Sequence, residues 1–204
     1  MTRNRTAVAL VAVLLILVAA AVLYFQSNSP SVSQFAYIRE PRLARMEDQR
    51  VMIAEATGAP KEVAGRAIGS LFKAYYKLEG VSKMQRPPAP RARWPDVADT
   101  PKDKWIGTYA MPVPEAVGAA PADSGLTIGN WAYGEVAEVL HIGPYNAEQP
   151  TIERLMRFIT SKGYRVIGDH EEEYVKGPGM LFAGDPNDYL TIIRLRVAKA
   201  NDRE

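Results

Sequence analysis

The sequence predicts an α+β fold made from two copies of one strand–helix–strand–strand plan, arranged pseudo-symmetrically with a ligand cleft between them. Each copy starts with an apolar strand candidate, passes through a turn that contains glycine and proline, and leads into an amphipathic helix that stops at a glycine. The turn glycines Gly58 and Gly143 lie 85 residues apart, and the stop glycines Gly80 and Gly163 lie 83 residues apart. This nearly constant spacing indicates an internal repeat.

The chain begins with an apolar segment, residues 7–25, that carries no charge over 19 positions. This length matches the roughly 20 residues that cross a bilayer as a helix. Arg3 and Arg5 precede the segment and no basic residue follows it before Arg39, which predicts a cytoplasmic N-terminus. We therefore expect residues 1–25 to form a single-pass membrane anchor, with the folded domain on the outer (periplasmic or extracellular) side.

A cleaved signal peptide is the alternative, because Ala19, Ala20 and Ala21 resemble a small-residue cleavage site. The apolar run continues past these alanines to Phe25, and this greater length favours a retained anchor. Residues 26–49 follow as a polar linker that passes into a charged stalk.

The folded domain is expected over residues 50–198, and its first copy of the plan over 50–114. A strand, a helix that Gly80 caps and two more strands are predicted at 50–57, 61–79, 91–97 and 105–112. The last two are expected to be edge or irregular strands, because five prolines lie in and around them. Residues 112–125, rich in proline, alanine and glycine, connect the copies.

The second copy is expected over residues 126–198. A strand, a helix, a hairpin of two short strands and a last strand are predicted at 136–142, 147–162, 164–167 with 172–175, and 189–197. Ile152, Leu155, Met156 and Ile159 form the apolar stripe of the helix. The last strand alternates, with Thr191, Ile193, Leu195 and Val197 on one face and Arg194 and Arg196 on the other.

Composition argues against several classes of site. The chain has no cysteine, which excludes disulfides, thiolate metal sites and cysteine nucleophiles. With only two histidines, His141 and His170, a histidine metal site is not expected, and no cofactor motif is present. Without Arg3 and Arg5 the basic residues equal the acidic ones, so no nucleic-acid partner is expected.

The segment Glu171–Glu172–Glu173–Tyr174 carries the strongest chemical signal. Because side chains alternate along a strand, Glu172 and Tyr174 share one face, while Glu171 and Glu173 share the other. A carboxylate on a half-buried face requires a partner. Glu172 is therefore a candidate to receive a cationic ligand or to act as a general base. The alternative is that all three glutamates are solvated on an exposed hairpin.

Five aromatic residues fall in or beside the predicted strands or the Gly-Pro turn, namely Trp94, Trp105, Tyr109, Trp131 and Tyr145. Aromatic side chains at such positions usually belong to the core. A pocket between the two copies would nevertheless take its walls from them.

The second copy resembles the GyrI-like, or AraC-type effector-binding, domain family. The matching features are the HxGPY turn, the Glu-x-Tyr pair and the closing Asp-Pro with its terminal strand, which here are His141, Gly143, Pro144, Tyr145, Glu172, Tyr174, Asp185, Pro186 and 191–197. The resemblance is good over 126–197 and looser over 50–114, where the proline-rich insert departs from the usual short hairpin.

The resemblance implies a small-molecule cleft between two pseudo-twofold units. In family members that bind drugs or other xenobiotics, an acidic residue in an aromatic pocket receives amphipathic cations, and Glu172 matches that residue. Some stand-alone members hydrolyse cyclopropane-bearing compounds with a glutamate and aromatic residues. No helix-turn-helix precedes the domain, so the chain is not expected to be a transcription regulator itself, and the expected anchor is unusual for the family.

Three functional hypotheses follow. The first is a membrane-tethered module that binds an amphipathic or cationic small molecule through Glu172 and aromatic side chains, without a metal or cofactor; the binding residues are Glu172, Tyr174, Trp131, Trp105, Tyr109 and Trp94. The second is a small-molecule hydrolase in which Glu172 is the general base and Tyr174 or Tyr145 assists. The third is a protein-interaction module with an unknown partner.

Overall fold

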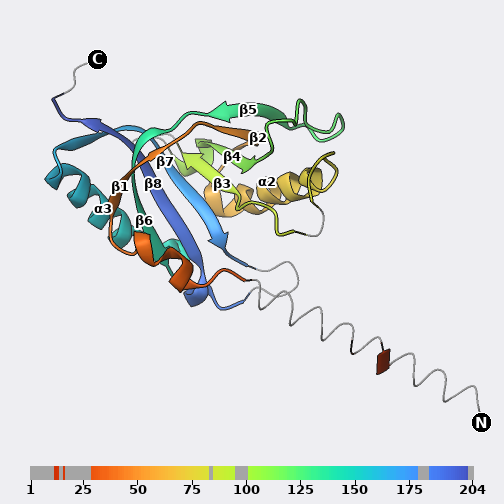
Figure 1. Cartoon of the computed structure of the whole chain (residues 1–204), viewed down its shortest axis with the longest axis horizontal. Helices are drawn as coiled ribbons and strands as arrows, with labels where there is room; N and C mark the ends of the chain where they lie inside the picture. Colours follow the sequence, from red (N-terminus) through yellow and green to blue (C-terminus); the bar gives the residue numbers. More distant parts are fainter. Residues whose placement is uncertain are drawn as a thin grey trace, which may run out of the picture. The chain divides into compact units, whose positions relative to one another are not determined.

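The protein was analysed as a computed structural model, which describes residues 12, 13, 16, 29–82, 85–94, 101–178 and 184–201. The chain divides into two compact units, Met1–Gln34 and Phe35–Glu204, and the second contains the sheet (Figure 1). The predicted anchor at 7–25 lies almost entirely outside the described residues, so it stays a prediction. Among the residues that are described, no helix is both long and apolar enough to cross a membrane.

Both copies of the predicted plan are present in the second unit, which confirms the α+β fold. The first copy consists of β2 (Gln49–Thr57), α2 (Pro60–Tyr75), β3 (Arg91–Trp94) and β4 (Ile106–Pro112). The second copy consists of β6 (Gly134–Ile142), α3 (Gln149–Ser161), β7 (Tyr164–Lys176) and β8 (Leu190–Lys199). Short 3-10 helices also occur: η1 (Val32–Ile38), η2 (Lys102–Lys104), η3 (Tyr145–Ala147) and η4 (Pro186–Asp188).

The strands form one antiparallel sheet of eight strands in the order β1-β6-β8-β7-β3-β4-β2-β5. The order is symmetric about its centre, where β7 of the second copy pairs with β3 of the first. Ala92 of β3 lies opposite Glu172 of β7 at this junction. The pseudo-symmetric arrangement therefore places the predicted site residue Glu172 where the two copies meet.

Each copy also lends a strand to the other. β1 (Arg42–Met46) continues after two residues into β2 but pairs with β6, while β5 (Thr127–Trp131) continues after two residues into β6 but pairs with β2. β1 lies in the segment 26–49 that the sequence analysis assigned to a linker. The folded domain begins earlier than residue 50, because the backbone of β1 is hydrogen-bonded into the sheet.

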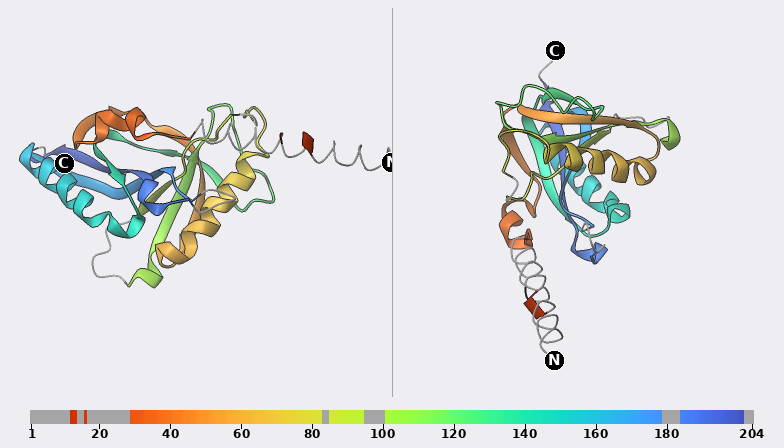
Figure 2. Two further views of the ribbon diagram at one scale, coloured as in Figure 1. Left: turned by 90° about the horizontal axis from the view of Figure 1, so that it is seen from below. Right: turned by 90° about the vertical axis from the view of Figure 1, so that its right-hand side faces the viewer.

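The helices α2 and α3 cover the same face of the sheet (Figure 2). Their apolar stripes explain this, because Leu71 of α2 and Leu155 of α3 are completely buried against residues of that face. Met156, predicted to belong to the stripe of α3, is instead 43% exposed. One buried apolar cluster lies under each of these helices, and the cluster under α2 extends to Ala92 and Trp94 of β3.

Several predicted features differ from the structure. The strands predicted at 91–97 and 105–112 are not edge strands, because β3 and β4 each pair on both sides in the interior of the sheet. The first helix ends at Tyr75 rather than at residue 79, because hydrogen bonds of the 3-10 type, such as Lys77 N–H to Ala74 O at 2.9 Å, tighten the chain there. The predicted hairpin of 164–167 and 172–175 is wrong, because β7 runs unbroken from Tyr164 to Lys176. The pairing of β7 with β8 shifts in register between Val166 and His170. Residues 167–169, part of which resembles a turn in the sequence, lie in this irregular stretch of a continuous strand.

The face opposite the helices holds a buried group of charges, here called the core ionic network. Its members are Arg91, Arg93, Arg194, Glu138, Glu171, Glu173 and Tyr133. Arg194, which is 4% exposed, donates to Glu171 Oε1 at 2.6 Å and to Glu138 Oε2 at 3.0 Å. Burial opposes its charge, but the surrounding carboxylates of Glu173, Glu171 and Glu138 raise the pKa of Arg194 further above its ordinary value.

Candidate functional site

Glu172 lies on the helix-covered face of β7, in line with side chains from neighbouring strands. Ala92 of β3 pairs with Glu172 on one side and with Tyr109 of β4 on the other, so these three side chains form a row across the sheet. Tyr174, two residues further along β7, lies on the same face, and its hydroxyl donates to Glu172 Oε2 at 2.8 Å. The alternation predicted for this segment is confirmed, and its middle glutamate is not solvated.

The adjacent glutamates have different partners. Glu171 and Glu173 point into the core ionic network, where arginine side chains neutralise them. Glu172 is 15% exposed, and its one ion-pair contact within the described part of the chain is with His170, whose Nε2 lies 3.0 Å from Oε1. Glu172 is therefore a nearly buried carboxylate without an arginine or lysine partner among those residues.

A second carboxyl group reaches this site from the turn that precedes α3. Gly143, at φ +131°, turns the chain after β6. Nε2 of the buried His141 donates to Pro144 O at 3.2 Å, and its Nδ1 lies 3.1 Å from Thr151 Oγ1 in α3. These contacts hold the turn against the helix, and Glu148 at the start of α3 points inward with 5% exposure.

Aromatic rings surround the two carboxyl groups. Tyr145 packs edge-on against Tyr174 with 5.4 Å between ring centroids, and it contacts Tyr189 at 5.3 Å. Tyr109 is fully buried, and its ring meets Trp94 edge-on at 5.2 Å. Its hydroxyl has no hydrogen-bond partner among the residues that the structure describes. We call Glu148, Glu172, Tyr109, Tyr145 and Tyr174 the acid–aromatic cluster.

Trp94 packs against Tyr109 at the edge of this cluster. It lies across from Gly107, where a Cβ atom would overlap the indole ring, so glycine allows the ring to lie flat on the strand. Trp105 continues the aromatic surface, with its ring centroid 6.3 Å from that of Trp94.

The two carboxyl groups have opposite ionisation tendencies. Burial works against the charge of Glu172, but hydrogen bonds from His170, Tyr174 and Glu148 hold its pKa below the ordinary value. Burial, and then the negative charge of Glu172, raise the pKa of Glu148 to about 9. At neutral pH Glu172 therefore carries the charge and Glu148 the proton.

The tyrosines remain protonated as hydrogen-bond donors. Burial, followed by the negative charge of Glu172, raises the pKa of both Tyr174 and Tyr109. Burial and the neighbouring Tyr189 and Glu148 raise that of Tyr145. The cluster thus offers one negative charge, one transferable proton and several ring faces.

The structure brings together most of the predicted site residues. Glu172, Tyr174 and Tyr145 are in contact, and Tyr109, Trp94 and Trp105 extend the same surface. Trp131 lies instead on the opposite face, where it packs with Val51 and Ala110 and the guanidinium of Arg93 lies 4.2 Å from its ring centroid.

Glu148 was not among the residues predicted from the sequence, and the predicted hairpin left His170 between its two strands. Glu148 follows a turn and shows no periodicity, and only the fold brings it beside Glu172, 24 positions later in the chain. His170 belongs to β7, where its even position puts it on the same face as Glu172. Alternation along an unbroken strand was the signal that could have located His170.

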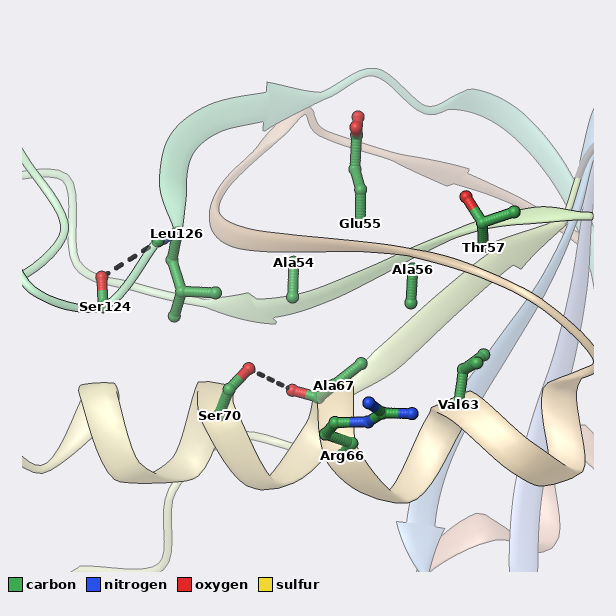
Figure 3. A pocket seen from close by; sticks show the side chains of 11 residues that line it. Ala54, Glu55, Ala56, Thr57, Val63, Arg66, Ala67, Ser70, Ser124 and Leu126 are labelled. Carbon is green, nitrogen blue, oxygen red and sulfur yellow. Dashed lines mark hydrogen bonds between the residues drawn. The ribbon is translucent and has the colours of Figure 1, made fainter.

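A surface pocket of about 370 Å³ lies between β2, α2 and the loop before β5 (Figure 3). It is on the same face of the sheet as the acid–aromatic cluster, and its lining residue Ala54 pairs with Tyr109 of that cluster. Small side chains of Ala54, Ala56 and Ala67 leave the space, and Arg66 and Ser70 of α2 line it. None of the residues predicted from the sequence to bind a ligand lines this pocket.

Comparisons with known proteins are consistent with this geometry. The model of the GyrI-like small-molecule-binding domain matches residues 39–198. No curated protein matches the chain.

The similar solved structures share the fold at low identity. A hydrolase from Listeria innocua is 20% identical and aligns 79% of this chain with 93% of that chain at a TM-score of 0.65. The C-terminal domain of EcmrR is 15% identical over 78% of this chain and 98% of that chain, at 0.61. EcmrR in a DNA complex is 15% identical over 90% of this chain and 65% of that chain, at 0.62.

Proposed function

The chain belongs to the GyrI-like family of small-molecule-binding domains, and we propose that it binds an amphipathic cation at the acid–aromatic cluster. One observation carries this proposal. Of the three consecutive glutamates, Glu172 alone lacks an arginine partner within the described residues, although it is nearly buried. A cationic ligand would supply the missing positive charge.

The rings around Glu172 define the chemistry of that ligand. The hydroxyl of Tyr174 lies 2.8 Å from the carboxylate, and its ring packs edge-on against that of Tyr145. Such rings attract an organic cation through their π-electrons. Tyr145 is 38% exposed and is the ring that a ligand would meet first. The apolar part of the ligand would then extend along Tyr109 and Trp94.

Binding can be tested with tetraphenylarsonium, an aromatic cation whose charge does not titrate. Tryptophan fluorescence of the full-length chain should change saturably, because Trp94 adjoins the cluster. Glu172→Gln keeps the shape but removes the charge, and it should weaken binding at least about tenfold, or about 1.4 kcal/mol.

Glu79→Gln is the matched control, since Glu79 is exposed in the turn that follows α2 and makes no side-chain contact that the structure records. Unchanged affinity in Glu172→Gln, or no saturable change in the wild type, would contradict the proposal.

A second candidate function is hydrolysis of a small molecule with a strained, cyclopropane-type ring. The observation that favours it is the adjacent pair of carboxyl groups with opposite ionisation. Ionised Glu172 would take a proton from water as its oxygen attacks a ring carbon, and protonated Glu148 would give a proton to the carbon that leaves. Turnover that survives Glu172→Gln would exclude this function.

We further propose that residues 7–25 tether the domain to a membrane with the N-terminus in the cytoplasm. The support is the uncharged length of this segment and the two arginines before it. The full-length chain should stay in the membrane pellet after alkaline carbonate extraction, whereas a chain released into the supernatant would contradict the tether.

A further inference from the structure

Glu148 and Glu172 lie side by side in a nearly dry part of the molecule. Glu148 is 5% exposed and Glu172 is 15% exposed, and they come from the start of α3 and from β7. Two like charges so close together, and so poorly solvated, repel strongly. A proton on one of them removes this repulsion and provides a hydrogen bond to the other.

Hydrogen bonding shows which group holds the proton. Glu172 already accepts from Tyr174 at 2.8 Å and lies 3.0 Å from His170 Nε2, so its ionised form is stabilised. Among the described residues, neither the buried Oε1 of Glu148 nor the Thr191 hydroxyl has a hydrogen-bond partner within ordinary geometry, although Thr191 lies near Glu148. The protonated form of Glu148 can instead donate to Glu172, which accounts for the opposite ionisation of the two groups.

No arginine or lysine in the described part of the chain forms an ion pair with Glu148. The polar and titratable groups around the pair come from β7, η3, β8, β4 and the residue before β8, and they are His170, Tyr174, Tyr145, Thr191, Tyr109 and Tyr189. Burial raises the pKa of Tyr109, Tyr145 and Tyr174, which keep their protons, so the pair as a whole carries one negative charge and one exchangeable proton at neutral pH.

We propose that a cation binds at this pair in exchange for the proton, so that Glu148 becomes the second carboxylate that contacts the ligand. This inference rests on the proposed cation-binding function and extends it. A positive charge between the two groups replaces the proton that suppresses their repulsion, and it also supplies a partner for Oε1 of Glu148. The proton is released to solvent, and no bond other than its O–H bond breaks.

The exchange makes affinity depend on pH in a defined direction. Below the pKa of free Glu148 the ligand must displace a proton, so raising the pH favours binding. Linkage limits the effect to about tenfold in affinity per pH unit for one proton. The dependence should disappear above about pH 9, where Glu148 of the free protein has already ionised.

Calorimetric titration of the full-length chain with tetraphenylarsonium tests the exchange, because this cation carries a fixed charge. Heats measured at about pH 7.5 in two buffers of different ionisation enthalpy give the number of protons released. We expect nearly one proton in the wild type, and a five- to tenfold gain in affinity per pH unit between about pH 6.5 and 8.5.

Two variants locate the proton. Glu148→Gln resembles the protonated side chain in shape and hydrogen bonding, and it should bind without proton release and with affinity independent of pH. Glu153→Gln removes an exposed carboxylate from α3, and it should release a proton as the wild type does.

The outcomes separate this inference from the proposed function. Saturable binding without proton release, or full release in Glu148→Gln, would overturn the exchange while leaving cation binding intact. Absence of binding at every pH would contradict the proposed function and the exchange together. Carboxyl ¹³C titration of the ligand-free protein gives a further check, since a Glu148 signal that titrates at the ordinary value of about 4.5 would overturn the proton-holding pair.

Discussion

At the scale of single residues, chemically identical side chains acquire different roles from their surroundings. Glu171 and Glu173 are neutralised by arginines of the core ionic network, whereas Glu172 is stabilised mainly by hydrogen bonds. Glu148 lies beside Glu172 and keeps its proton. The difference arises from which face of β7 a residue occupies and from what the neighbouring strands place opposite it.

Replacing Glu148 by glutamine should make stability less dependent on pH. Burial and the charge of Glu172 raise the pKa of Glu148 to about 9 in the folded chain, whereas the unfolded chain ionises near the ordinary value of 4.5. The folded state therefore holds the proton more tightly. Its contribution to stability is full below the unfolded pKa and is lost as the pH rises towards about 9, by up to about 1.4 kcal/mol per pH unit.

Urea unfolding at about pH 5, 7 and 9 measures this effect. The stability of Glu148→Gln relative to the wild type should increase with pH, while Glu153→Gln should follow the wild-type curve. Parallel curves for the wild type and Glu148→Gln would show that Glu148 is not a buried, protonated acid.

Alternation predicted the faces of Glu172 and Tyr174, because the period of a strand depends on local backbone geometry alone. It could not predict Glu148 or the absence of Trp131 from the cluster. Those placements depend on which strands pair and on which face of the sheet the helices pack, and neither can be recognised from the residue pattern of a short segment of sequence.

At the scale of elements, the fit between β3 and β4 positions Trp94 beside the acid–aromatic cluster. Gly107 of β4 faces Trp94 of β3, and a Cβ atom at this position would overlap the indole ring. The periodic helices and the repeat were predictable from the sequence. The unbroken β7 was not, because Gly168 and Asp169 resemble a turn locally, and only pairing with β8 and β3 shows that the strand continues.

Gly107→Ala should therefore destabilise the protein by about 1–3 kcal/mol, since the indole ring must move out of a packed position. Gly65→Ala is the matched control on the exposed side of α2, where no atom lies within 4 Å of the added carbon. It should stabilise the protein by up to about 1 kcal/mol through helix propensity. Equal effects of both substitutions on the free energy of unfolding would contradict the proposed packing of Trp94.

At the scale of the whole molecule, the two copies are joined by exchanged strands and by buried charges. β1 and β5 each pair with the other copy, and Arg91 and Arg93 of the first copy bind Glu173 and Glu171 of the second. The sequence indicated the repeat but not these exchanges, since pairing over separations of 74 (Ile53 with Thr127) to 96 residues (Arg42 with Glu138) has no counterpart in local periodicity. We therefore expect the copies to unfold together in one transition.

Arg194→Leu should destabilise the protein by about 3–5 kcal/mol, because it leaves buried carboxylates without their central cation. Arg157→Leu, on a side chain that is 72% exposed, should change the free energy of unfolding by no more than about 0.5 kcal/mol. Similar, small losses in both variants during urea unfolding would show that the buried ion pairs of Arg194 do not stabilise the fold.

The central claim is that a cation binds where the two copies meet, and nuclear magnetic resonance tests it most directly. Labelled full-length protein would be titrated with tetraphenylarsonium while the Glu172 carboxyl and the rings of Tyr145 and Tyr174 are followed. We predict saturable shifts at these groups and none at Arg66 or Ser124 in the pocket between β2, α2 and the loop before β5. Saturable shifts confined to that pocket, with Glu172 unchanged, would contradict the account.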